Sequence, residues 1–356
     1  YKRQDVAIYG AQAIAFSTYK AIKEIYKEYN VCCFIVTSID NNPTELDGIP
    51  VYSLSELIRM KFNKNNMKVV IATPESVISE IKDNLEQKGF TNIESIDSEK
   101  FAYLQEQYYK KTAFCDVLSS YPYGETKAEL EIYMTKFWKD KELISKMLLP
   151  QYFVSVQAGA ANTDVRVCDI LDNEGDNISA RNGDYSELTV LYWAWKHMMR
   201  GEKYYGLAHY RRYLMLDEKD LYRLENNDID VVLPYPMIYE SDIQVHHKRY
   251  LSEEEWMALL QALEELYPNY AEAYKDILKK PYFYNYNIIL AKKNVMDDYC
   301  NWLFSILFRV EKIVNSNGNR KPNRYIGYIG ENLTTLYFIY NQKRLKIAHT
   351  GCKFLK

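Results

Sequence analysis

The first hundred residues alternate between two kinds of segment, and this alternation constrains the fold more than any other feature of the chain. Apolar runs suited to strands occur at 6–9 (VAIY), 32–37 (CCFIVT) and 69–73 (VVIAT), and helix-length amphipathic stretches separate them. This order is typical of a parallel sheet whose strands are joined by crossover helices. Because single cores rarely grow beyond about 250 to 300 residues, the 356-residue chain is expected to contain two α/β domains.

Composition changes along the chain and marks the expected boundary. All five histidines lie at or beyond His197, and all five tryptophans lie at or beyond Trp138. We predict a Rossmann-like parallel-sheet domain over residues 1–98, a polar, tyrosine-rich helical connector over 99–130, and a second α/β domain over 131–356.

Charge and cysteine content exclude several classes of protein. The formal net charge of -3 provides no basic excess for nucleic acid, so nucleic acid is not an expected partner. The six cysteines include no CxxC pair, which predicts neither a disulfide framework nor a zinc site and fits a reducing cytoplasm. No apolar run approaches the roughly 18 to 20 residues that cross a bilayer. We therefore expect a cytoplasmic protein.

The first domain gives only a weak indication of a ligand. Its first strand ends at Gly10, the only glycine of a GxGxxG phosphate loop that is present, and Asp40 lies where a ribose-binding acid could stand. Either the domain binds a nucleotide or nucleotide-sugar, or it serves packing or oligomer contacts. The segment GIPVYSLSEL at 48–57 resembles the Rossmann-like domain that precedes several bacterial sugar-modifying enzymes, including sugar acyltransferases, and implies a sugar-nucleotide context.

The second domain holds an unusual cationic strand end. The apolar strand YYGLAHY at 204–210 is followed directly by Arg211 and Arg212. Two guanidinium groups can hold a diphosphate through bidentate hydrogen bonds and neutralise its charge. The alternative is a surface cluster of ion pairs, although packing alone explains poorly why so apolar a strand ends in this way.

Eight segments in order resemble successive motifs of a family of capsular and exopolysaccharide glycosyltransferases with the HYRRY motif: QAGA at 157–160, DNEGDNIS at 172–179, NGDYSELTVLYWAWK at 182–196, GLAHYRRY at 206–213, VVLPYP at 231–236, NYNIILAKK at 285–293, DDYCNWLF at 297–304 and RYIGYIGENL at 324–333. The resemblance covers residues 130–345. It implies a GT-A-like domain that uses a nucleotide-activated sugar, and UDP-galactofuranose is a donor associated with the family.

Two departures from the GT-A and family patterns affect the expected site. In GT-A enzymes the end of a strand like 204–210 carries a DxD pair that holds a divalent metal, whereas this chain has arginines there. We expect that no cofactor is required, and a metal-dependent transferase remains the alternative. Family members often carry a His-Lys pair after the first strand of this domain; TKFWKDKEL at 135–143 has no histidine, and Lys136 or Lys139 could take part of that role.

The resemblance and the residue chemistry together nominate the donor-binding residues: Gln157, Asp176, Asn177, Asn182, Glu187, His209 and His349. Asp176 and Asn177 lie on a polar loop, where turn formation is the alternative role. Ser186 is expected to cap the following helix, and Glu187 either holds sugar hydroxyls or contributes only to the cap. His349 lies in KIAHTGCKF, which resembles the His-Gly-Lys segment that closes over the diphosphate in some GT-A enzymes.

Glu331, Arg211 and Arg212 are the predicted catalytic residues. Inverting transfer needs a carboxylate that takes the proton of the acceptor hydroxyl. Glu331 follows two glycines at the start of an apolar helix, where GT-A folds commonly hold their catalytic acid; the alternative is an acid that only stabilises the helix N-terminus. The candidates for contacting the acceptor are His246, His247 and Asn287. The adjacent histidines lack a third ligand for a metal.

These observations predict a hexosyltransferase. It would move a hexosyl group, galactofuranosyl in its most specific version, from a UDP-sugar to a saccharide or lipid-linked acceptor in capsular or exopolysaccharide synthesis. The alternative is a non-catalytic sugar-nucleotide sensor or scaffold of a polysaccharide assembly complex. Peripheral association with the inner face of the membrane and a homo-oligomeric state both remain open.

Overall fold

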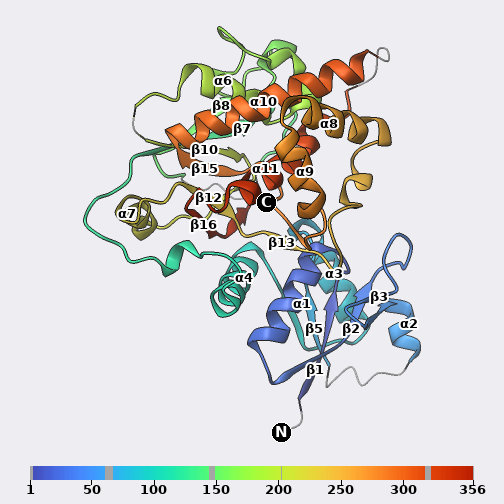
Figure 1. Ribbon diagram of the computed structural model, residues 1–356. Coiled ribbons are helices and arrows are strands. Elements are labelled where there is room, and N and C mark those ends of the chain that lie inside the picture. The colour runs from blue at the N-terminus through green and yellow to red at the C-terminus, as the bar shows by residue number, and fades with distance from the viewer. Residues whose placement is uncertain (1–2, 61–66, 144–148, 202, 317–321, 356) are drawn as a thin grey trace.

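The computed structural model describes residues 3–60, 67–143, 149–201, 203–316 and 322–355, and places them around two β-sheets (Figure 1). The first sheet comes from the N-terminal part of the chain and the second from the remainder. The expected α/β fold, with an N-terminal parallel sheet ahead of a second domain, is confirmed, and the second sheet is mixed.

The first sheet has the strand order β3-β4-β2-β1-β5-β6. Its strands are β1 (Gln4–Tyr9), β2 (Tyr29–Val36), β3 (Glu45–Leu46), β4 (Ile49–Ser53), β5 (Lys68–Ile71) and β6 (Ile93–Ser95). Neighbouring strands are parallel except β3 and β4. The chain builds outward from β1 through β2 to β4 and then returns to the other side of β1, so the strand order reverses between β1 and β5.

The helices of the first domain are α1 (Ala13–Ile25), α2 (Leu54–Arg59), α3 (Glu75–Gln87) and α4 (Ser98–Thr112). Helices α1 and α4 pack on each other, and their core includes Tyr235 and Met237 from the second domain. The Tyr109 hydroxyl on α4 donates to the carbonyl of Pro236 at 2.6 Å. The two domains therefore share one buried apolar interface.

The second sheet has the strand order β16-β12-β15-β10-β7-β8-β9, with β11 and β17 attached beside β10. Its strands are β7 (Leu130–Lys136), β8 (Phe153–Gln157), β9 (Ile170–Leu171), β10 (Tyr204–His209), β11 (Arg212–Leu214), β12 (Val231–Pro234), β15 (Ile289–Lys292), β16 (Ile347–Thr350) and β17 (Cys352–Phe354). Because β7, β8 and β10 run parallel, Lys136, Gln157 and His209 end at the same edge. Gly206 lets β15 approach β10 closely, since a Cβ there would lie 2.8 Å from the Ile289 carbonyl oxygen.

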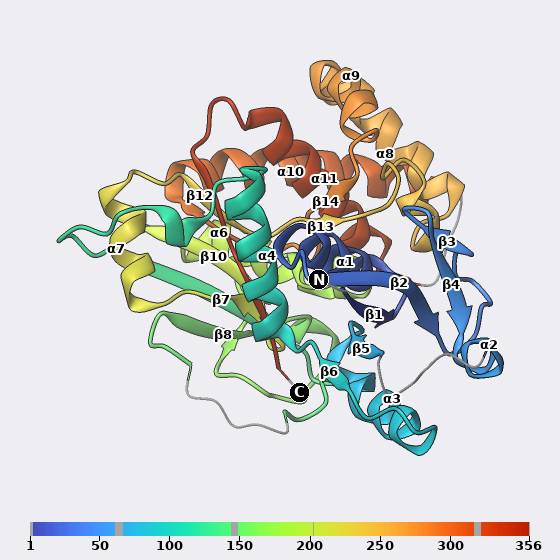
Figure 2. The same ribbon diagram turned by 90° about the horizontal axis from the view of Figure 1, so that it is seen from below.

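Helices cover the second sheet and supply most of its core. They are α5 (Asn182–Tyr185), α6 (Leu188–His197), α7 (Glu218–Asn226), α8 (Glu253–Leu266), α9 (Pro268–Ile277), α10 (Lys293–Asn315) and α11 (Tyr325–Asn341); a short ribbon of β13 (Met237–Ile238) and β14 (Tyr282–Phe283) lies apart. The largest apolar cluster joins α6, α8, α10 and α11 to the sheet. Figure 2 shows α4 alongside the C-terminal segment, and α4 contacts β17. No described helix is both long and apolar enough to cross a membrane.

Candidate active site

The β10–β11 hairpin presents the two arginines of the HYRRY segment. His209 at the end of β10 pairs with Arg212 at the start of β11, and β11 pairs in turn with β17. The Arg212 guanidinium lies 4.5 Å from the ring centre of Tyr286 and 5.5 Å from that of Phe354. Stacking on aromatic faces holds a guanidinium in place while its N–H edge stays available for an anion.

Arg211 is held less completely. Its Nη2 donates to the Lys141 carbonyl at 3.2 Å, and its guanidinium lies 5.0 Å from the ring centre of Tyr210. Its Nε is buried without a hydrogen-bond partner. Within the described part of the chain, neither Arg211 nor Arg212 has a carboxylate within ion-pair distance. Burial raises the pKa of the Asp140 carboxyl, and the positive charge of Arg211 acts against that rise.

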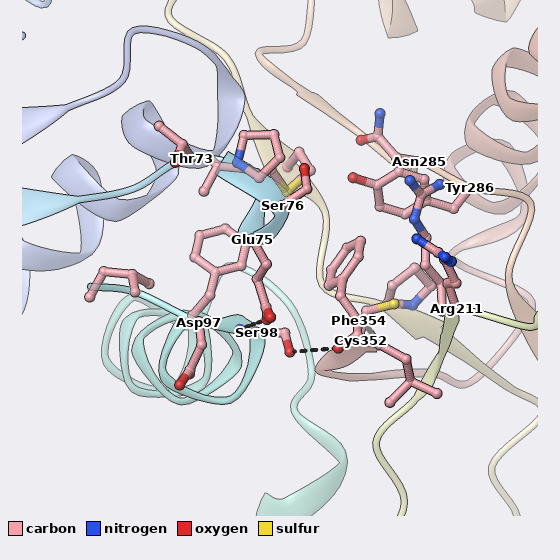
Figure 3. Close-up of a pocket in the computed structure, with 18 of the residues that line it drawn as sticks. Thr73, Glu75, Ser76, Asp97, Ser98, Arg211, Asn285, Tyr286, Cys352 and Phe354 are labelled. Atoms are coloured by element: carbon pink, nitrogen blue, oxygen red, sulfur yellow. Dashed lines mark hydrogen bonds between the residues drawn. The ribbon is translucent and has the colours of Figure 1, made fainter. Parts of the chain in front are cut away.

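The arginines line a cleft of about 700 Å³ between the two domains (Figure 3). One wall comes from the carboxyl ends of β5 and β6 and includes Thr73 and Ser76. The other wall contains the hairpin together with Asn285 and Tyr286. In Figure 3 these two groups of side chains face each other across the cleft.

Two carboxyl groups lie beside the hairpin. The Glu187 Oε1 accepts from Asn287 Nδ2 at 2.7 Å and lies 3.9 Å from His209 Nε2. Removal from water raises the pKa of Glu331 to about 8, and the negative charge of Glu187 acts in the same direction. A backbone hydrogen bond from Tyr286 and the positive charge of Arg212 oppose this rise in the pKa. A carboxyl group with a raised pKa beside a second carboxyl group is typical of acid–base sites.

His209 connects the hairpin to these groups. Its Nε2 lies 2.8 Å from the Tyr286 carbonyl oxygen, so this nitrogen carries the proton and donates. Burial lowers the pKa of His209, and the nearby Glu187 charge acts against that lowering. The neutral His209 imidazole thus donates a hydrogen bond to the backbone of Tyr286, and the Tyr286 ring in turn stacks with Arg212.

Strained backbone gathers at the same place. Ser186, Tyr286, Asn287 and Arg324 all have positive φ, at 51°, 81°, 48° and 65°. Arg324 Nε donates to Ser186 Oγ at 3.0 Å, so two of these residues hold each other. Non-glycine residues in this region cost of order 1–3 kcal/mol each and concentrate at functional sites.

Comparison with known proteins gives a family and a related fold. The model of a domain of unknown function, DUF4422, matches residues 138–343. The chain belongs to the DUF4422 family. No curated protein matches it.

Five solved chains match this DUF4422 protein, among them an apo structure of the bifunctional glycosyltransferase WbbM. That match has a TM-score of 0.54 and 27% sequence identity. It covers 64% of this chain and 45% of the other, so this chain spans less than half the length of the solved structure. The fold thus resembles that of a glycosyltransferase.

Two helix starts differ from expectation in this DUF4422 domain. Ser186 does not cap α6, because the helix begins at Leu188 and the Ser186 hydroxyl accepts from Arg324. Glu187 occupies the cap position without a side-chain cap bond, and its carboxylate turns to Asn287. Glu331 is not at the start of its helix, since α11 begins at Tyr325 and places it almost two turns further on, beyond the reach of the helix-terminal dipole.

Three other predicted donor residues are tied into the scaffold. Both Gln157 amide atoms bond the backbone of a neighbouring loop, at Val165 and Val167. Asn182 Nδ2 donates to the Ser186 carbonyl and supports the strained turn. His349 is buried, with Nδ1 at 3.0 Å from the Asp116 carbonyl oxygen and Nε2 at 2.8 Å from the Tyr284 hydroxyl. Their direct contact with a donor stays a prediction.

Arg211 and Arg212 line the cleft, and none of the other predicted site residues does. Asp176 accepts from the Tyr192 hydroxyl, and Asn177 bonds the backbone of its own loop, as in the turn-forming alternative. His246 and His247 lie on a 3-10 turn, where His247 stacks on Trp256 with ring centres 3.9 Å apart. His246 packs among aromatic rings, and burial lowers its pKa to about 4.

Arg324 and Tyr286 are site residues that the sequence did not single out. Both residues lie in segments that resemble the family motifs. Tyr286 is the second residue of NYNIILAKK, and Arg324 is the first residue of RYIGYIGENL. Their place in these segments was the only sequence feature that could have indicated them. Their left-handed backbone has no glycine to mark it. The first domain contributes Thr73 and Ser76 to the cleft, and no sequence motif marked either residue.

Proposed function

We propose that this DUF4422 protein is a glycosyltransferase that moves a hexosyl group from a UDP-sugar to a saccharide or lipid-linked acceptor in capsular or exopolysaccharide synthesis. One observation carries the proposal. A carboxyl whose pKa is raised to about 8 lies close enough to Arg212 for its charge to affect that pKa, and Arg212 has no ion-pair partner among the described residues. The structural likeness to WbbM supports the reaction class.

The proposed chemistry divides between the carboxyl and the arginines. The acceptor hydroxyl oxygen forms a bond to the anomeric carbon while the bond from that carbon to the diphosphate oxygen breaks. The ionised Glu331 carboxylate takes the hydroxyl proton, and Arg211 and Arg212 neutralise the charge that the departing diphosphate gains. A group with a pKa near the working pH suits proton transfer because it exchanges its proton in either direction.

Metal is not required in this scheme. Two guanidinium groups supply the charge that a divalent cation provides in many nucleotide-sugar enzymes. Among the described residues, no cluster of three histidine, cysteine, aspartate or glutamate side chains is arranged to hold a metal ion. Galactofuranose is the sugar that the family resemblance favours for the donor.

The test measures UDP release from a panel of UDP-sugars, including UDP-galactofuranose, with saccharide and polyprenyl-linked acceptors. Wild-type protein should release UDP with and without EDTA. Glu331→Gln should lose about 100-fold or more of the turnover, in line with removal of a general base, and Arg211→Ala should lose turnover through weaker diphosphate stabilisation. Glu272→Gln, on an exposed side chain of α9, is the matched control.

Three outcomes would contradict parts of the proposal. Full turnover by both site variants would remove Glu331 and Arg211 from the mechanism. Loss of turnover in EDTA would restore the metal-dependent alternative. Tight UDP-sugar binding without turnover on any acceptor would favour the sensor or scaffold.

A further inference from the structure

The first domain forms half of the interdomain cleft, and it does so at a particular place in its sheet. Ile14, near the start of α1 after β1, lines the cleft, and so do Thr73–Ser76 and Ser79, after β5. Strand order reverses between β1 and β5. In open α/β sheets, ligands bind in the crevice outside the carboxyl ends of the strands at this reversal. The cleft therefore begins where a sheet of this topology is built to hold a ligand.

The start of α3 supplies hydroxyl groups and backbone donors on this wall. The helix is 13 residues long, follows Pro74, and has no side-chain cap bond at its N-terminus. Ser76 and Ser79, in its first two turns, line the cleft. By contrast, Asp97 caps α4 by accepting from Lys100 N at 2.9 Å. The N–H groups at a helix start point along the helix axis and, with the helix dipole, favour a bound anion.

The opposite wall provides an independent indication of an anionic ligand. Arg211 and Arg212 both face the cleft, and neither forms an ion pair with any described residue. Three polar atoms of cleft-lining residues are buried and lack hydrogen-bond partners: Thr73 Oγ1, Arg211 Nε and Asn285 Oδ1. Buried polar groups are normally paired, so unpaired ones on two facing walls point to a missing partner between them.

The rest of the lining contains aromatic and apolar side chains together with polar ones, including the carboxyl groups of Glu75, Asp97 and Glu142. Two of these carboxyl groups already accept hydrogen bonds from backbone N–H groups, Glu75 from Ser98 and Asp97 from Lys100. Phe101 of α4 and Tyr235 lie on the lining, and Tyr286 and Phe354 flank Arg212. Such side chains offer faces for a nucleobase or sugar ring. The volume of about 700 Å³ lies within the usual range of small-molecule sites, about 300 to 1,000 Å³.

We propose that a nucleoside diphosphate binds across this cleft, with its phosphates between the arginine pair and the start of α3 and its base among the aromatic side chains. The first domain is then part of the donor site rather than a separate module. This inference rests on the proposed function for the identity of the ligand. It adds a wall of the site that lies outside the region matched by the DUF4422 model.

The experiment compares two substitutions on one turn of α3. Ser76→Glu places a negative charge in the cleft, whereas Val77→Glu places the same charge on the next residue, which is 37% exposed and outside the lining. Both positions tolerate an acid, because the start of a helix favours negative charge. Ser76→Gln tests the added volume without the charge. Calorimetric titration of the full chain with UDP, and with CDP, GDP and dTDP in parallel, gives the dissociation constants.

We expect Ser76→Glu to weaken binding of the tightest diphosphate about tenfold or more, since like charges meet in a partly desolvated cleft. Val77→Glu should stay within about twofold of wild type, and Ser76→Gln should fall between the two. Equal affinities for Ser76→Glu and wild type, or no binding of any diphosphate by wild type, would overturn the inference.

Turnover measured on the same samples separates this inference from the proposed function. If the protein transfers sugar and Ser76→Glu leaves the dissociation constant unchanged, the proposed function stands and the first domain is not part of the donor site. If Ser76→Glu weakens diphosphate binding but no acceptor receives a sugar, the nucleoside diphosphate site in the cleft stands and the transferase function is contradicted.

Discussion

Replacing Glu331 with glutamine should make the protein more stable at alkaline pH while lowering the proposed sugar-transfer turnover about 100-fold or more. The folded-state pKa of Glu331 is raised from 4.5 to about 8, so the folded protein holds a proton that the unfolded chain releases. The stability that this proton contributes is complete below pH 4.5 and is lost as pH rises through about 8. Glutamine keeps the shape and has no proton to lose.

The magnitude follows from proton linkage. With one group at a pKa of about 8 in the folded state and 4.5 in the unfolded state, the free energy of unfolding falls by about 1 to 2 kcal/mol between pH 6.5 and 8.0. Buried histidines also change the free energy of unfolding over this pH range. Because wild type and Glu331→Gln contain the same histidines, their contributions cancel in the difference between the two proteins. The free energy of unfolding of Glu331→Gln relative to wild type should therefore grow by about 1 to 2 kcal/mol over this pH range.

Urea unfolding followed by tryptophan fluorescence provides the assay, because all five tryptophans lie at or beyond Trp138 and report on the second domain. Glu272→Gln, at an exposed site, should run parallel to wild type at every pH. A constant difference between wild type and Glu331→Gln from pH 6.5 to 8.0 would show that the Glu331 pKa is not raised and would refute its assignment as a base working near neutral pH.

Two further predictions concern the neighbours of this carboxyl. Gly330→Ala should lower the free energy of unfolding by about 1 to 3 kcal/mol, because a Cβ there would lie 2.8 Å from a leucine of α6 and 3.0 Å from Asn287 Oδ1. Gly327→Ala, whose nearest contact is 3.5 Å, should not destabilise, and urea unfolding of both variants checks this. Glu187→Gln should move the alkaline inflection of the rate profile to lower pH, because the Glu187 charge raises the pKa of Glu331; an unmoved inflection would contradict that coupling.

The fold could be predicted further than the site because its signals are local. Apolar runs and their spacing indicated the parallel sheet, and the runs at 32–37 and 69–73 overlap β2 and β5. The start of α6 was wrong for a tertiary reason. Ser186 is a good local cap, but its hydroxyl is engaged by Arg324, 138 residues away.

The site depends on contacts that sequence spacing does not encode. Asn287 reaches Glu187 across 100 residues, and nothing in either segment specifies the pairing. His349 matched a diphosphate-closing segment, yet its ring nitrogens contact the Asp116 carbonyl and the Tyr284 hydroxyl. The arginine pair was found because two charges after an apolar strand are conspicuous in one local stretch of sequence.

The four left-handed residues around the hairpin have a consequence for protein engineering. Glycine adopts the backbone of Ser186, Tyr286, Asn287 and Arg324 without strain, so a library selected only for heat resistance should enrich glycine at these positions. Each such gain would remove a side chain from the neighbourhood of the proposed base. Selection for thermal tolerance and selection for turnover should therefore choose opposite residues here, and sequencing the survivors of both would map the site without a bound ligand.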